Sequence, residues 1–282
     1  MILGTLSCVH SLAQPFNSYR GTEDEYSLTV GPVPSVHAEA PDEKSTVRSS
    51  YAIPAGTILP VRLNSTVSSA KSKPGQVITG RIMHDVPLSS DIRIKEGSKV
   101  VGHIVEVTPA SIGKTACISL QFDKLISGHM TISITTNLRA IAGFMRINEA
   151  QTPPIGPGES DVYRWLTTVQ IGGDIVYGEG GPVTTGNDPN DVVGKAVHGG
   201  VLSQLRANEV AKCRGATDSN EALKALWVFS SDACGIYGFE HISIVSAGRS
   251  GVVGVIVFSS DKENLKIPGG AGMLLRVNKT CD

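Results

Sequence analysis

The densest group of reactive side chain types lies in residues 232–260, where a cysteine, a histidine, an arginine and a serine occur between two apolar runs. Cys234 and His241 have the residue types of a thiolate–imidazole pair, which would support nucleophilic catalysis. Such a pair needs spatial contact and a third group that orients the histidine, and closeness in sequence establishes neither. We therefore interpret Cys234 as half of a disulfide and His241 as a surface residue at the start of a strand.

The run Gly248-Arg249-Ser250-Gly251 has some features of the turn that exposes a nucleophilic serine in hydrolases. Val252 stands where that motif requires a second glycine, and strands are predicted on both sides instead of a strand and a helix. The stretch is more typical of a β-hairpin with Ser250-Gly251 at its turn. Arg249 and Arg276 are then weak candidate contacts for an anionic partner, with solvated turn and strand-end positions as the simpler interpretations. No catalytic residue is predicted.

Two histidines are candidate ligand residues in the first half of the chain. His84 ends a predicted strand and precedes Asp85, and His103 lies on a neighbouring predicted strand, so the two histidines could meet across a sheet. A metal site would need further ligands in recognisable register, and these are missing. An exposed cross-strand polar pair is the simpler interpretation. We predict no metal and no cofactor.

Two glycine- and aspartate-rich stretches invite comparison with ligand loops. The glycines between 172 and 181 match neither the P-loop nor the dinucleotide fingerprint, and turns explain them. Asp188, Asn190 and Asp191 resemble a fragment of a calcium loop, but a proline interrupts the spacing and the terminal glutamate is missing. Asx turns are therefore the default interpretation of these side chains.

The composition predicts many short strands. The chain has 282 residues with 31 glycines and 15 prolines, and only 5% of its residues are aromatic. Valine, isoleucine and threonine recur in short alternating runs separated by turn signals, a pattern typical of all-β domains. Lys and Arg together number 25 against 26 for Asp and Glu. This balance gives no basic stripe, so we do not expect a nucleic-acid partner.

These patterns divide the chain into modules. We expect an all-β fold with little helix, in which residues 51–147 form a small barrel and residues 169–282 form a second β-rich module, sandwich- or barrel-like. Residues 148–168, rich in proline and glycine, are the predicted linker. Residues 14–50 are polar and lack apolar periodicity, so they are predicted to be a flexible leader.

The N-terminal residues and the cysteines favour export. Residues 1–13 are apolar and end in a small-residue pattern before Gln14, as in a signal segment, although a basic start is missing. A lipoprotein would use Cys8, whose preceding residues fit poorly. Removal of Cys8 would leave four cysteines, which fits a disulfide-bonded exported protein. We prefer a Cys213–Cys234 bridge, with Cys117 as a buried thiol in the alternative. No segment reaches the length of a membrane helix.

The stretch 53–107 contains a characteristic series of residues: Ile53-Pro54-Ala55-Gly56-Thr57-Ile58-Leu59-Pro60-Val61-Arg62-Leu63, Ser68, Ser69, Pro74-Gly75-Gln76-Val77, Asp85-Val86, Ile94-Lys95-Glu96-Gly97-Ser98 and Val101-Gly102. In this order they resemble the TrbI-like β-barrel domain of type IV secretion and conjugation channel proteins. The resemblance implies a barrel in the cell envelope. The helical antenna and the membrane anchor of that family have no counterpart here, so the barrel module would be shared while the secretion role is not.

The C-terminal part is similar to segments of uncharacterised exported bacterial proteins, through residues 233–239 and 272–277. That similarity implies an envelope location and no particular activity. Taken together, these features predict a non-catalytic envelope or secreted protein, in the periplasm, at the outer membrane surface or outside the cell. Its partners would be other envelope proteins or surface components, with oligomers possible. The alternatives are a subunit related to a type IV secretion channel and an envelope hydrolase that uses carboxylates or the Cys–His pair.

Overall fold

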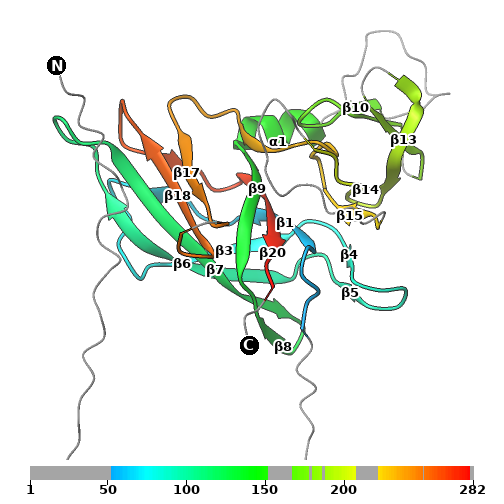
Figure 1. Cartoon of the computed structure of the whole chain (residues 1–282), viewed down its shortest axis with the longest axis horizontal. Helices are drawn as coiled ribbons and strands as arrows, with labels where there is room; N and C mark the ends of the chain where they lie inside the picture. Colours follow the sequence, from blue (N-terminus) through cyan, green and yellow to red (C-terminus); the bar gives the residue numbers. More distant parts are fainter. Residues whose placement is uncertain are drawn as a thin grey trace, which may run out of the picture. The chain divides into compact units, whose positions relative to one another are not determined.

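The structure is a computed structural model that describes residues 52–151, 167–177, 180–185, 188–207, 222–249 and 251–279 (Figure 1). The predicted signal segment 1–13 and the predicted leader 14–50 lie outside the described residues, and so does most of the predicted linker 148–168. The described residues form many short strands and one short helix, α1 (Phe144–Gln151). The prediction of an all-β fold with little helix is confirmed.

Ten strands of the described residues form one large sheet, in the order β16-β9-β20-β1-β3-β6-β7-β18-β17, with β8 also paired to β7. All the pairings are antiparallel except that of β16 with β9. The strands are β1 (Ile58–Leu63), β3 (Val77–Ile82), β6 (Lys99–Thr108), β7 (Ala116–Ser127), β8 (Met130–Ser133), β9 (Thr136–Ala142), β16 (Gly235–Tyr237), β17 (Ser243–Ala247), β18 (Val255–Ser260) and β20 (Gly272–Val277).

Six strands of the described residues form a second sheet, in which they follow one another in sequence order. Two small ribbons complete the fold, β2 (Val67–Ser68) with β19 (Lys266–Ile267) and β4 (Val86–Pro87) with β5 (Arg93–Ile94). The strands of the second sheet are β10 (Thr167–Val169), β11 (Ile175–Tyr177), β12 (Pro182–Thr185), β13 (Asp188–Val197), β14 (Gly200–Ser203) and β15 (Lys224–Ala225).

The large sheet is apolar on both faces where the second sheet covers it. β1 and β20 are buried along almost their whole length, because each contributes side chains to two hydrophobic clusters. Leu59 and Leu275 belong to one cluster with the interior of the large sheet, and Ile58 and Leu274 belong to the other with the second sheet and α1. Complete burial of each such side chain stabilises the fold by about 1.5–3 kcal/mol.

Strands from both ends of the sequence share the large sheet. β20, red in Figure 1, lies between β1 and β9, and β18 pairs with β7. The predicted boundary at 148–168 therefore does not separate two sheets, because strands that follow it complete the sheet begun before it. The physical reason is that the side chains of β1 and β20 are apolar on both faces. Such strands are stable only in the interior of a sheet, with a strand paired at each edge and other side chains packed on each face.

The predicted small barrel is not closed. β16 and β17 end the path of the large sheet, and no hydrogen-bonded pairing joins these two strands in the described residues. β16 has only three residues, and Gly238, with a φ of 66°, turns the chain away directly after it. No helix in the described part of the chain has the length and apolar character needed to cross a membrane.

Candidate functional site

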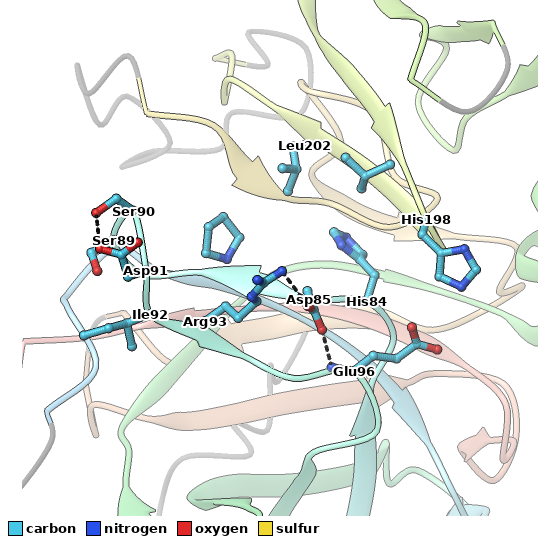
Figure 2. Close-up of a pocket in the computed structure, with 12 residues that line it drawn as sticks. His84, Asp85, Ser89, Ser90, Asp91, Ile92, Arg93, Glu96, His198 and Leu202 are labelled. Carbon is cyan, nitrogen blue, oxygen red and sulfur yellow. Dashed lines mark hydrogen bonds and ion pairs between the residues drawn. The ribbon is translucent and has the colours of Figure 1, made fainter.

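The candidate site is a groove between the β4–β5 ribbon and the turn that joins β13 to β14 (Figure 2). Its volume is about 400 Å³. The ribbon supplies most of the polar side chains, and the second sheet supplies the opposite wall. The lining residues are His84, Asp85, Pro87, Ser89, Ser90, Asp91, Ile92, Arg93, Glu96, Val197, His198 and Leu202.

Asp85 holds the base of the β4–β5 ribbon together. Its Oδ1 accepts the main-chain N–H of Glu96 at 2.9 Å, and its Oδ2 accepts from Arg93 at 3.3 Å (Figure 2). Oδ2 also accepts from Nζ of Lys95 at 3.4 Å. Partial burial raises the pKa of this carboxyl, but the Glu96 N–H and the Lys95 and Arg93 charges outweigh burial and lower the pKa below its usual value. Asp85 is therefore ionised, and its carboxylate oxygens are occupied by hydrogen bonds within the β4–β5 ribbon.

His84 is completely buried behind the groove, where it connects to the second sheet. Its Nε2 accepts the main-chain N–H of Trp227 at 3.0 Å, whereas its Nδ1 has no hydrogen-bond partner. Burial lowers the pKa of His84 to about 4, against a smaller opposing effect of Asp85. The imidazole is therefore neutral at physiological pH and carries its proton on Nδ1. The prediction that His84 is an exposed polar residue is wrong.

The turn after β13 packs directly onto this histidine. Gly199 has a φ of 78°, and the space at Gly200 is fully occupied by its neighbours. A Cβ atom at Gly200 would lie 2.7 Å from Cα of Trp227 and 2.8 Å from Cδ2 of His84. Only glycine allows so close an approach of the two backbones. In the sequence, the Gly199-Gly200 pair indicates a close approach of the backbone to another segment. It does not indicate that this segment contains His84 and Trp227.

His103 does not join His84. On the β3–β6 ladder His103 lies opposite Val77, whereas His84 follows the other end of β3. His103 instead places Nδ1 2.9 Å from Oδ2 of Asp123, at a partly exposed position. The two histidines, which could have met across the sheet, do not do so, because the antiparallel register puts them at opposite ends of the strand pair.

The other predicted ligand candidates lie elsewhere. His241 is exposed, has a φ of 60° and has its Nε2 3.9 Å from Glu240. Arg249 is half-buried and donates to Oδ1 of Asn137 at 3.5 Å and to the carbonyl of Leu138 at 3.3 Å. It is therefore bound to β9 and is not a simple solvated turn residue. The predicted hairpin is confirmed, because β17 and β18 form an antiparallel pair.

Cys234 lies directly before β16, and its N–H donates to the hydroxyl of Tyr237 at 3.0 Å. Cys213, its predicted disulfide partner, lies outside the described residues. The Cys213–Cys234 pairing therefore stays a prediction. Ser250 of the excluded serine motif also lies outside the described residues.

The aspartates near β13 make turn and cross-strand contacts. Oδ1 of Asp188 accepts the N–H of Asn190 at 2.9 Å, which is the Asx turn expected from the sequence. Asp191 accepts from Thr185 at 2.8 Å and from Arg206 at 2.7 Å. Within the described ranges, no group of three His, Cys, Asp or Glu side chains is placed to hold a metal ion.

A second cavity, of about 560 Å³, borders the start of β11. Asp174 lies in its wall, almost fully buried, and accepts the N–H of Ser231 at 2.6 Å. Burial raises the pKa of this carboxyl, although its hydrogen bonds to Ser231 oppose the rise. Gly172 and Gly173, with φ values of 115° and 121°, form the turn that the glycine-rich sequence predicted.

Comparison with known proteins adds no relative to this geometry. No protein-family model matches the chain, and none of the curated proteins matches it. The site must therefore be interpreted from its own residues. Asp91, Arg93 and Glu96 offer charges of both signs, Ser89 and Ser90 offer hydroxyl groups, and the opposite wall is apolar at Leu202. Such a lining can orient a ligand by hydrogen bonds while burying its apolar part.

Proposed function

We propose that the chain is a non-catalytic binding or scaffolding protein of the bacterial cell envelope or the exterior, and that it binds its partner in the groove. The observation that carries this proposal is the groove itself, a hollow of about 400 Å³ between two hairpins with a mixed polar and apolar lining. Hollows of this size and lining are where proteins commonly bind small molecules or side chains of a partner.

Two titratable groups of the groove lining, His84 and Asp85, are engaged in holding the structure together, which supports a binding role for this part of the groove. His84 uses its acceptor nitrogen for the Trp227 N–H, so a general base there would first lose that bond. Asp85 is held by three donors and is kept ionised by them. The remaining charged groups of the lining, Asp91 and Glu96 among them, are suited to holding a partner.

An envelope or extracellular location is supported by the cysteines and by the resemblance to TrbI-like domains. Cys117 and Cys234 are the two described cysteines that we expect to be oxidised, and their exposed fractions are 5% and 7%. Disulfides persist mainly in oxidising compartments. A role as a channel-related subunit stays an alternative that rests on the resemblance alone.

Site-specific photocrosslinking tests the binding proposal. A photoreactive amino acid replaces Ile92, which lines the groove and is 42% exposed, in the protein exported by a bacterial host. We expect crosslinks to an envelope component that excess unlabelled protein suppresses. The same probe at Ile112, an exposed residue that does not line the groove, is the matched control. Equal adducts at both positions, or none at either, would overturn the proposal.

Substrate turnover separates the binding protein from the hydrolase. We expect no hydrolysis of ester, glycoside or peptide model substrates above that of a buffer blank. Hydrolysis that is lost in Asp91→Ala or Glu96→Gln, with folding unchanged by circular dichroism, would replace the proposal with an envelope hydrolase. The Glu149→Gln variant changes an exposed carboxylate on α1 and is the control for a general charge effect.

A further inference from the structure

Three arginines converge on one region of the large sheet, and none of them lines the groove. Arg139 is the extra residue of a β-bulge in β9, since Leu138 pairs with Leu275 and Ala140 pairs with Leu274. Bulges of this kind redirect a side chain out of the regular alternation of a strand. Here the bulge turns Arg139 toward carbonyl groups of the second half of the chain.

The guanidinium of Arg139 is almost completely buried, at 2% exposure. One terminal nitrogen donates to the carbonyl of Arg206 at 3.0 Å and to that of Ser231 at 3.1 Å, whereas its Nε is buried without a hydrogen-bond partner. Burial of a charged group costs free energy unless the charge is paired. Two neutral carbonyls compensate this charge only in part, and Asp232 is an acidic group that also acts on it.

Two more guanidinium groups reach the same place. Arg276 of β20 lies directly opposite Asn137 of β9, so the two residues share a face of the sheet. Arg249, from the turn between β17 and β18, donates through Nε to Oδ1 of that same Asn137 at 3.5 Å. One asparagine thus marks the point where strands β9 and β20 and the β17–β18 turn meet.

The three positive charges act on one another. Burial, Arg249 and Arg276 lower the pKa of Arg139 to about 10, while Asp232 and Tyr237 oppose the shift. Burial and Arg276 likewise lower the pKa of Arg249. The geometry agrees, because Arg249 also donates to the carbonyl of Leu138, the residue directly before Arg139 on β9, at 3.3 Å.

Arg249 and Arg276 are only half-buried, so the cluster is open to solvent on their side. Both make further contacts within the chain. A guanidinium carries five N–H donors in a planar fork, so an arginine that already makes several contacts can still receive an anion.

We propose that Arg139, Arg249 and Arg276 form a binding site for a phosphate-type dianion. A doubly charged oxyanion offers acceptors in the geometry that guanidinium forks match, and it offsets the mutual repulsion of three cations. The buried Arg139 supplies the fixed base of the site, and the two half-buried arginines supply its entrance. A carboxylate carries a single charge and compensates the cluster less completely.

Isothermal titration calorimetry with inorganic phosphate at constant ionic strength tests the site. We expect wild-type binding that weakens at least about tenfold in Arg249→Gln and in Arg276→Gln, as expected for loss of a charge-assisted contact. Arg81→Gln removes an exposed arginine of β3 and should leave affinity unchanged. Absence of wild-type binding would overturn the proposal, and so would an equal loss in Arg81→Gln.

A second series addresses the buried arginine and the source of the phosphate. Arg139→Lys keeps the charge but removes the fork, and we expect weaker phosphate binding with an unchanged fold; if that variant does not fold, Arg249→Gln and Arg276→Gln decide. Tighter binding of a small phosphomonoester than of inorganic phosphate would support a soluble ligand. Binding to phosphatidic acid vesicles, whose headgroup is a phosphomonoester like the proposed dianion, that Arg249→Gln abolishes would support a lipid headgroup. Vesicle binding that Arg81→Gln reduces equally would indicate general electrostatics and overturn the proposal.

Discussion

The imidazole of His84 accepts the main-chain N–H of Trp227 at 3.0 Å across 143 residues of sequence. The bond joins the segment after β3 in the large sheet to the segment after β15 in the second sheet. Trp227 has a φ of 56°, which is unfavourable for a tryptophan, and its side chain is 1% exposed beside Phe229. His84 therefore helps to hold both the unusual backbone of Trp227 and the wall of the groove.

We expect His84→Ala to lower the free energy of unfolding by about 2–4 kcal/mol, because it leaves a cavity and an unpaired buried N–H. Urea denaturation measures the change. His129→Ala is the matched control, since His129 lies exposed in the turn between β7 and β8 and should change stability by less than about 0.5 kcal/mol. Equal losses in the two variants would contradict the role assigned to His84.

Stability should depend on pH through the same residue. The pKa of His84 is about 4 in the folded chain because of burial, against 6.5 for the unfolded side chain. As the pH falls below 6.5 the unfolded chain takes up a proton, whereas the folded chain does so only near 4. Stability is therefore complete above that range and declines through it, by up to about 3 kcal/mol.

Urea denaturation at several pH values across this range measures the decline. The His84→Asn variant lacks the titrating group, so its stability should fall less steeply with decreasing pH than that of the wild type. His129→Asn removes an exposed histidine and should keep the wild-type slope. Parallel slopes for wild type and His84→Asn would mean that His84 is not the group responsible.

Gly200→Ala should be strongly destabilising, although its backbone conformation is accessible to alanine. The added methyl would meet Cα of Trp227 at 2.7 Å and Cδ2 of His84 at 2.8 Å, so the β13–β14 turn must move away from both. We expect a loss of about 2–4 kcal/mol, at or above the range for overpacked sites. Thermal denaturation followed by circular dichroism measures it.

Gly128→Ala is the comparison for that substitution. Gly128 has a φ of 58° and open space around its Cα, so its replacement costs backbone strain alone, about 1 kcal/mol. A smaller effect at Gly200 than at Gly128 would show that the turn does not pack on His84 as described.

The local elements of the fold could be predicted from sequence, and their pairing could not. The alternation in β6 and the two runs that became β17 and β18 were recognisable, because each strand has its own period and its own turn signals. The pairing of β1 with β20 joins Leu59 to Leu275, and nothing local in either strand specifies the other. The helix α1 was missed because its only core residues are Ile147 and Ala150, within a polar segment.

The site was harder to predict for the same reason. His84 was recognised as a residue of interest, but its burial is decided by the distant turn at Gly199-Gly200 and by Trp227. Arg249 was placed in its turn correctly, but its contact with Asn137 depends on how far the β17–β18 hairpin lies over β9. Side chain chemistry could be inferred from the residue type, whereas the environment that determines its role came from pairing across the chain.

The cysteines provide the test of the predicted compartment. If the protein is exported, Cys117 and Cys234 should resist alkylation in denaturant until a reductant is added, because both are expected to be oxidised. The denaturant is essential, since both side chains are buried and a folded thiol would also react slowly.

Intact mass before and after reduction reports the number of oxidised pairs, and peptide mapping tests the Cys213–Cys234 pairing. Reduction should lower stability by about 2–5 kcal/mol. Immediate alkylation of Cys234 in the unreduced, unfolded protein would show that the predicted disulfide does not exist. The proposed envelope location would then rest on the TrbI-like resemblance alone.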